Sequence, residues 1–162
     1  MLQRKVCLVG SFAVGKTSLL QRFVYSRFSD KYLTTVGVKI DRKIVPTSHG
    51  SLGLILWDLA GEDEFQSLQT SYLRGAAGFV VVIDCTRNET LHQASRHLEY
   101  LAEEFPDASK VVLINKTDLE NAWDLEATAL ESLQQRYTVL KTSAKSGQNV
   151  EEAFHELAEA MG

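Results

Sequence analysis

The stretch GSFAVGKT, residues 10–17, decides the fold class of this chain. It follows an apolar run at 6–9 and precedes a segment, 17–24, whose apolar residues recur with helical spacing. A strand, a glycine-containing turn and a helix N-terminus together surround an anion with backbone N–H groups. Gly10, Gly15, Lys16 and Thr17 satisfy the pattern G-x-x-x-x-G-K-[ST], in which the lysine reaches phosphates and the hydroxyl binds Mg²⁺. The stretch therefore predicts a nucleoside di- or triphosphate site, with an ordinary glycine-rich turn as the alternative.

Length and composition indicate one globular domain over residues 1–162, with 44% hydrophobic residues to form a core. The net charge of −4 argues against a nucleic-acid partner. Both cysteines, Cys7 and Cys85, lie in apolar runs, which is typical of buried thiols in a reducing cytoplasm. We expect neither a signal peptide nor a membrane span, because no apolar run approaches about 18 residues.

Strand and helix patterns alternate along the chain. A hairpin is predicted from alternation at 38–45 and 52–56, and the continuous apolar runs at 78–83 and 111–114 predict strands covered on both faces. This order predicts an α/β fold with a six-stranded, mostly parallel sheet, one antiparallel edge strand and helices on both faces. Ligands of such sheets bind outside the carboxyl ends of the strands. The remaining predicted elements are helices at 90–105, 122–135 and 149–161 and a strand at 138–140.

The segment WDLAGE, residues 57–62, ends the second hairpin strand. A carboxylate there, Asp58, can hold Mg²⁺ through water, and the backbone N–H of Gly61 can meet a γ-phosphate oxygen. The pattern D-x-x-G is common by itself. Its position one strand away from a phosphate-binding loop makes it informative.

Two further loops suit a guanine base. In NKTD, residues 115–118, the carboxylate of Asp118 can accept from the N1–H and exocyclic amine of guanine, whereas adenine offers no such pair of donors. Asn115 would tie this loop to its neighbours, and the stem of Lys116 can lie along the base. In TSAK, residues 142–145, a backbone N–H can point at the guanine oxygen.

These four motifs, in this order and spacing, resemble those of the small GTPases of the Ras superfamily. LLQRFVYSRFSDKYLTTVGVKI, residues 19–40, and WDLAGEDEF, residues 57–65, are most similar to the Rab branch, and the loop FAVGKT also resembles Rab-like GTPases of bacteria. The resemblance covers essentially the whole chain. It implies the small G-protein form of the P-loop NTPase fold, GTP or GDP with Mg²⁺ as ligands, and a molecular switch that hydrolyses GTP.

The resemblance also implies roles for single residues. Thr35 would bind Mg²⁺ and sense the γ-phosphate, and Phe28 would lie against the guanine, with an anchor for its loop as the alternative reading. The expected metal ligands are Thr17, Thr35 and, through water, Asp58; the expected catalytic residues are Lys16, Thr35, Gly61 and Glu62. The expected nucleotide-binding residues are Phe12, Ala13, Val14, Gly15, Lys16, Thr17, Ser18, Phe28, Thr35, Asp58, Gly61, Asn115, Lys116, Asp118, Ser143, Ala144 and Lys145.

Three residues depart from the family pattern. Glu62 stands where the family has a glutamine that orients water, so slow hydrolysis is expected, or general-base action by Glu62 as a weaker alternative. Phe12 would obstruct an arginine supplied by an activating protein, and Ala13 occupies a site that is normally glycine. A guanine-nucleotide scaffold with negligible hydrolysis is therefore the second hypothesis. A nucleotide kinase is disfavoured, because no arginine-rich lid segment is present.

Partners are expected to be effector, exchange-factor or activating proteins, which would bind the loops near 26–40 and 59–74. The chain stops at residue 162 without the prenylated cysteine tail of Ras and Rab proteins, and Met1-Leu2 does not allow myristoylation. No intrinsic membrane anchor is expected.

Overall fold

The computed structural model describes residues 1–29, 38–59 and 70–162. Its elements, in chain order, are β1 (Leu2–Gly10), α1 (Lys16–Tyr25), β2 (Val38–Thr47), β3 (Gly50–Leu59), α2 (Thr70–Leu73), β4 (Ala76–Asp84), α3 (Asn88–Glu104), β5 (Ser109–Asn115), the 3₁₀ helix η1 (Thr117–Ala122), α4 (Ala127–Arg136), β6 (Thr138–Lys141) and α5 (Val150–Met161).

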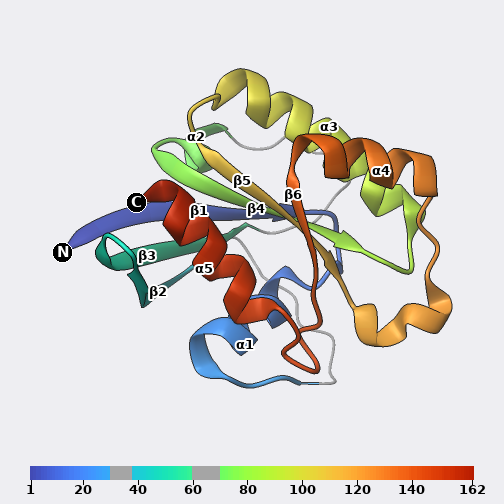
Figure 1. The fold of residues 1–162 in the computed structure, drawn as a ribbon, viewed down its shortest axis with the longest axis horizontal. Coiled ribbons are helices and arrows are strands. Elements are labelled where there is room, and N and C mark those ends of the chain that lie inside the picture. The colour runs from blue at the N-terminus through green and yellow to red at the C-terminus, as the bar shows by residue number, and fades with distance from the viewer. Residues whose placement is uncertain (30–37, 60–69) are drawn as a thin grey trace.

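The strands form one six-stranded sheet in the order β2-β3-β1-β4-β5-β6 (Figure 1). The hairpin pair β2–β3 is antiparallel, and the other neighbouring pairs are parallel. Helices α1 and α5 contribute to the core on one face of the sheet, and α3 and α4 contribute to the core on the other. The predicted fold class is confirmed.

The two faces of the sheet carry separate apolar clusters, and this explains the continuous apolar runs. Along β4, Val80 and Val82 belong to the α1–α5 cluster, whereas Val81 and Ile83 belong to the α3–α4 cluster. A strand that is buried on both sides needs apolar residues at every position. Burial of each such side chain contributes about 1.5–3 kcal/mol to stability.

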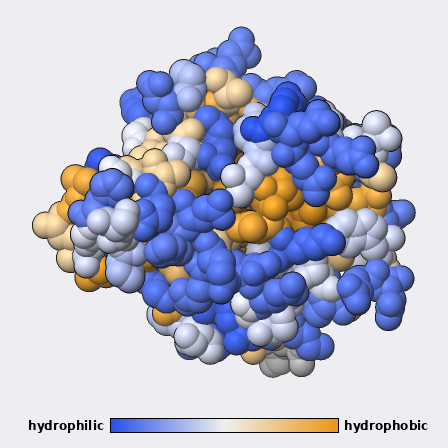
Figure 2. Space-filling view, in the orientation of Figure 1, coloured by the Kyte–Doolittle hydropathy of each residue, from blue (hydrophilic) through white to orange (hydrophobic). Residues whose placement is uncertain are grey.

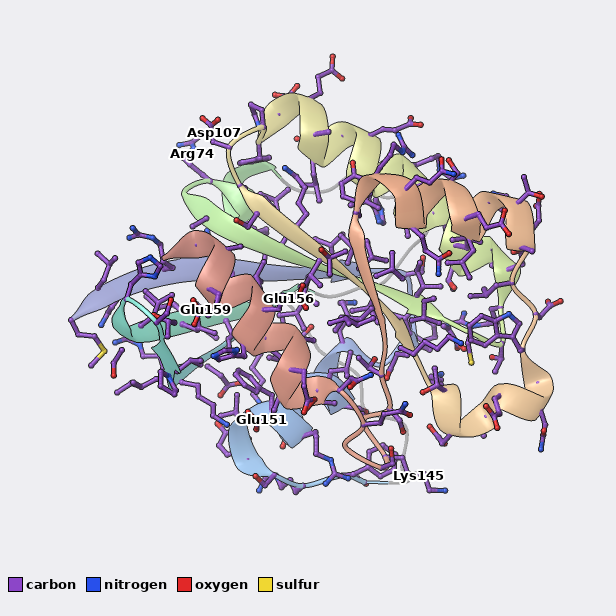
Figure 3. The ribbon with its side chains drawn as sticks, in the orientation of Figure 1. Arg74, Asp107, Lys145, Glu151, Glu156 and Glu159 are labelled. Carbon is purple, nitrogen blue, oxygen red and sulfur yellow. The ribbon has the colours of Figure 1, made fainter. Side chains whose placement is uncertain are left out.

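Helix α5 shows how one helix serves both core and surface. Its buried side includes Phe154, whose ring stacks on that of Phe23 from α1 at a centroid distance of 4.1 Å. Glu151, Glu156 and Glu159 project from the helix on the surface of the molecule (Figure 3). The face seen in Figure 2 is mainly hydrophilic, with an apolar area between α5 and α4.

The helix predicted at 122–135 begins later than expected. Residues Thr117–Ala122 form the 3₁₀ helix, and α4 starts only at Ala127. The intervening backbone donates elsewhere: Asp124 N–H to the carbonyl of Cys85 at 2.8 Å, and Glu126 N–H to Oδ1 of Asn88 at 2.8 Å. These bonds replace the i to i−4 pattern that a continuous helix needs.

Both cysteines are free and buried, as predicted. Burial raises the pKa of the Cys7 thiol to about 12, so this side chain acts as a small apolar residue. Within the described residues, no helix is long and apolar enough to cross a membrane.

Candidate functional site

The predicted phosphate-binding loop, residues 10–17, joins β1 to α1 at the carboxyl edge of the parallel strands. Ala13 (φ 64°) and Gly15 (φ 101°) both adopt the left-handed region, which curls the loop toward the start of α1. A Cβ on Gly10 would lie 2.9 Å from Cγ2 of Val14, and one on Gly15 would lie 2.3 Å from Nδ2 of Asn115. Both glycines of the motif are therefore needed for the shape of the loop.

Lys16, the first residue of α1, has its side chain inside the loop. The residue is 7% exposed, and its Nζ donates to the carbonyl of Gly10 at 3.3 Å. Burial lowers the pKa of Lys16, and the negative charge of Asp58 opposes this effect. A buried ammonium group favours the arrival of an anion, because a negative charge stabilises its protonated form.

Thr17 and Asp58 bring two hard oxygen ligands together. Asp58 is fully buried near the end of β3, and its Oδ2 accepts from Oγ1 of Thr17 at 2.7 Å. Because β3 pairs with β1, with Leu8 opposite Asp58, the carboxylate lies beside the phosphate-binding loop. Mg²⁺ is typically held by one or two protein oxygens together with substrate phosphates and waters, and this pair fits that donor set.

Side-chain hydrogen bonds join the loop after β5 both to the loop after β6 and to the phosphate-binding loop. Nδ2 of Asn115 donates to the carbonyl of Val14 at 3.0 Å, so this asparagine ties its loop to the phosphate-binding loop as predicted. Oγ1 of Thr142 donates to Oδ1 of Asn115 at 3.3 Å, and Oγ of Ser143 donates to Oδ1 of Asp118 at 2.7 Å. Asp118 is exposed, with its carboxylate held in place by this serine.

Arg22 of α1 was not singled out from the sequence. Its Nε donates to the carbonyl of Ala144 at 2.7 Å, and its Nη2 donates to the carbonyl of Lys145. Ala144 is buried, and Lys145 lies at the turn between β6 and α5 (Figure 3). A single guanidinium thus fixes the backbone of the loop expected to face the base.

Asp84, the last residue of β4, and Arg87, which follows it, were also missed. Lys116 Nζ lies 2.8 Å from the carbonyl of Ala13 and 2.9 Å from Oδ2 of Asp84. Arg87 contacts the same carboxylate at 3.0 Å and donates to the carbonyl of Phe12 at 2.7 Å. The only sequence signal was that Asp84 ends an apolar strand at the edge of the sheet where the motifs meet.

Some of the remaining predicted residues are described by the structure, and others are not. Phe12 is 48% exposed, Val14 is buried and Ser18 is half-buried. Phe28 is half-buried against the α1–α5 cluster, and its expected contact with guanine stays a prediction. Thr35, Gly61 and Glu62 lie outside the described residues, and so do parts of the expected partner-binding segments 26–40 and 59–74.

The strand–loop–helix unit with buried Lys16, beside the Thr17–Asp58 pair, defines a P-loop protein of the α/β class. The chain belongs to the Ras family, whose family model matches residues 5–162. It is therefore a small GTPase, a class of protein that binds and hydrolyses GTP.

Two relatives support the Rab-like resemblance. The chain is 32% identical to the Ras-related protein Rab-1D of Dictyostelium discoideum over 160 residues, which cover 95% of this chain and 77% of the relative. It is 34% identical to the Ras-related protein SEC4 of Saccharomyces cerevisiae over 160 residues, covering 97% and 74%. The narrower resemblance to bacterial GTPases stays a prediction.

Proposed function

We propose that this chain is a guanine-nucleotide switch that binds GTP or GDP with Mg²⁺ at the site described above and hydrolyses GTP slowly. The observation that carries the proposal is the position of Lys16: a buried cation inside a loop that is itself bonded to the Asn115–Asp118 segment. These bonds support a phosphate site and a base site that would lie together at one edge of the sheet.

The phosphate end would be bound by Lys16 and the backbone N–H groups of residues 13–18. Thr17 would hold Mg²⁺ directly, Asp58 would do so through water, and Thr35 is proposed as a further ligand. When bound, Mg²⁺ neutralises charge that develops on the phosphate oxygens during transfer. Lys16 would place its charge on the terminal phosphates, which compensates for its burial.

The base end would be recognised by Asp118. One carboxylate oxygen accepts from Ser143, and this bond would leave the other oxygen available for the N1–H and amine of guanine. The backbone N–H of Ala144 would donate to the guanine oxygen, and the stem of Lys116 would lie along the base. Adenine offers no matching pair of donors to this carboxylate, and this would disfavour ATP.

Slow hydrolysis is proposed from Glu62 and Phe12. A carboxylate can accept from the attacking water but cannot donate to the γ-phosphate, and the position of Glu62 in the family pattern would bring its charge near an anion. The exposed ring of Phe12 would occupy the space through which an activating protein could insert an arginine. The alternative is a scaffold that binds guanine nucleotide with negligible turnover.

Single-turnover hydrolysis of GTP by the wild-type chain, Glu62→Gln and the control Glu64→Gln tests this proposal. We expect slow turnover in the wild type and in Glu64→Gln, and roughly 100-fold faster turnover in Glu62→Gln, the lower end of the scale on which one positioned group acts. Slower turnover in Glu62→Gln would favour general-base action. No turnover in any of the three would favour the scaffold.

Partners are proposed to be proteins that read the segments near 26–40 and 59–74 in the GTP state, since loss of the γ-phosphate releases such segments. The net charge of −4 supports protein partners over nucleic acid. The two free, buried cysteines suit a reducing compartment, and we propose the cytoplasm.

A further inference from the structure

We infer that Arg87 is a positioning residue for nucleotide binding: together with Asp84 it holds the phosphate-binding loop in its binding shape from the side opposite the ligand. The inference rests on the proposed function, because it concerns the same loop. It adds a residue pair that none of the four sequence motifs contains.

Three consecutive carbonyls of the loop accept side-chain hydrogen bonds. The carbonyl of Phe12 accepts from Arg87 at 2.7 Å, that of Ala13 from Lys116 at 2.8 Å, and that of Val14 from Asn115 at 3.0 Å. Arg87 follows β4, Asn115 is the last residue of β5, and Lys116 follows β5. A carbonyl oxygen turned toward a phosphate would repel it, so donors that hold these oxygens on one side favour phosphate binding on the other.

Asp84 fixes both cations of this arrangement. It is 1% exposed, and its Oδ1 accepts from the N–H of Thr86 at 2.9 Å and from the Thr86 hydroxyl at 2.7 Å. Oδ2 lies 3.0 Å from Nε of Arg87 and 2.9 Å from Nζ of Lys116. Burial acts to raise the pKa of Asp84, but hydrogen bonds from Thr86 and the Lys116 contact hold it below its ordinary value. The carboxylate therefore stays charged and aims two cations at the loop.

The shape of the guanidinium suits Arg87 to this position. Its Nε faces Asp84 while Nη2 reaches the carbonyl of Phe12, so one rigid group spans the carboxylate and the loop. A lysine has one terminal nitrogen and is less able to span both partners. The loop needs such support, because Ala13 has a Cβ and still adopts a left-handed conformation at φ 64°.

The role can be separated from a general effect on folding by comparing GDP with GMP. GDP carries the β-phosphate that a phosphate-binding loop surrounds, whereas GMP depends mainly on the base site. Loss of Arg87 should therefore weaken GDP much more than GMP. The exposed Arg96 lies on helix α3, whose N-cap residue is Arg87, and provides the matched control.

We would measure the affinities of the full chain for GDP and GMP, in Mg²⁺, by displacement of a fluorescent GDP. Arg87→Ala is expected to weaken GDP roughly tenfold, the scale of one charge-assisted hydrogen bond, and GMP less than about twofold. Arg87→Lys should recover part of the loss, and Arg96→Ala should match the wild type. Thermal melts would verify folding, and should Arg87→Ala fail to fold, the GDP-to-GMP comparison on Arg87→Lys decides.

Unchanged GDP affinity in the folded Arg87→Ala chain, or equal weakening of GDP and GMP, would overturn the inference. A wild-type chain that binds neither GDP nor GTP would instead overturn the proposed function. The two failures are therefore distinguishable in one set of titrations.

Discussion

An alanine at position 15 would bring its Cβ to 2.3 Å from Nδ2 of Asn115, a separation that real side chains do not reach. Asn115 has little freedom to move away. It is 1% exposed, its Nδ2 donates to the carbonyl of Val14 at 3.0 Å, and its Oδ1 accepts from Thr142 at 3.3 Å. Gly15→Ala is therefore expected to separate the phosphate-binding loop from the loop after β5.

Two effects add to the loss of stability in Gly15→Ala. An alanine at φ 101° is strained by about 1–2 kcal/mol. Displacement of Asn115 leaves buried polar groups without their hydrogen bond, which costs about 1–3 kcal/mol. The free energy of unfolding should thus fall by about 2–5 kcal/mol.

Gly50→Ala separates the two effects. Gly50 has a similar φ of 110°, but a Cβ there would meet nothing within 4 Å. Urea unfolding of the two variants should therefore show Gly15→Ala to be less stable than Gly50→Ala by about 1–3 kcal/mol. Equal losses would refute the claim that the contact between Gly15 and Asn115 holds the two loops together.

Three further predictions concern single side chains. Ala13→Gly should raise the free energy of unfolding by about 1 kcal/mol, because glycine relieves the left-handed conformation; a lower melting temperature would contradict this. Burial and two nearby cations lower the pKa of His97 from 6.5 to about 4, so the unfolded chain binds a proton here before the folded chain does. Between pH 6.5 and 4 the wild type should therefore lose up to about 3 kcal/mol more stability than His97→Gln, and parallel pH profiles would contradict the shift. Arg22→Ala should speed GDP release roughly tenfold by freeing the carbonyls at 144 and 145, and an unchanged rate would show that they need no such support.

Local pattern in the sequence predicted the six strands and the helices α1, α3, α4 and α5 in their order, but not the short helix α2 or the 3₁₀ helix η1. The alternation at the hairpin and the apolar runs of β4 and β5 report burial directly, because each strand faces one or two packed layers. The start of α4 could not be predicted in this way. Residues 123–126 contain no glycine or proline that would exclude a helix. The N–H groups of Asp124 and Glu126, however, bond to Cys85 and Asn88, and periodicity carries no information about such contacts.

Some residues of the site can also be predicted from local sequence, and others cannot. Lys16, Thr17 and Asn115 stand in short motifs whose chemistry can be read from spacing. Arg87 reaches a carbonyl 75 residues away in sequence, and Arg22 reaches one 122 residues away. Only the fold brings these pairs together. For Ala13, the sequence shows that an alanine occupies a site that is normally glycine. It does not show that this alanine keeps the left-handed backbone of a glycine.

The most direct test of the account is to denature the purified chain and identify the nucleotide that it releases by chromatography. We expect a guanine nucleotide: GDP if turnover occurs in the cell, or GTP if hydrolysis is nearly absent. An adenine nucleotide would contradict the assignment of Asp118 to the guanine base. A chain that carries no nucleotide and also fails to take up added GDP would show that this site does not bind guanine nucleotide.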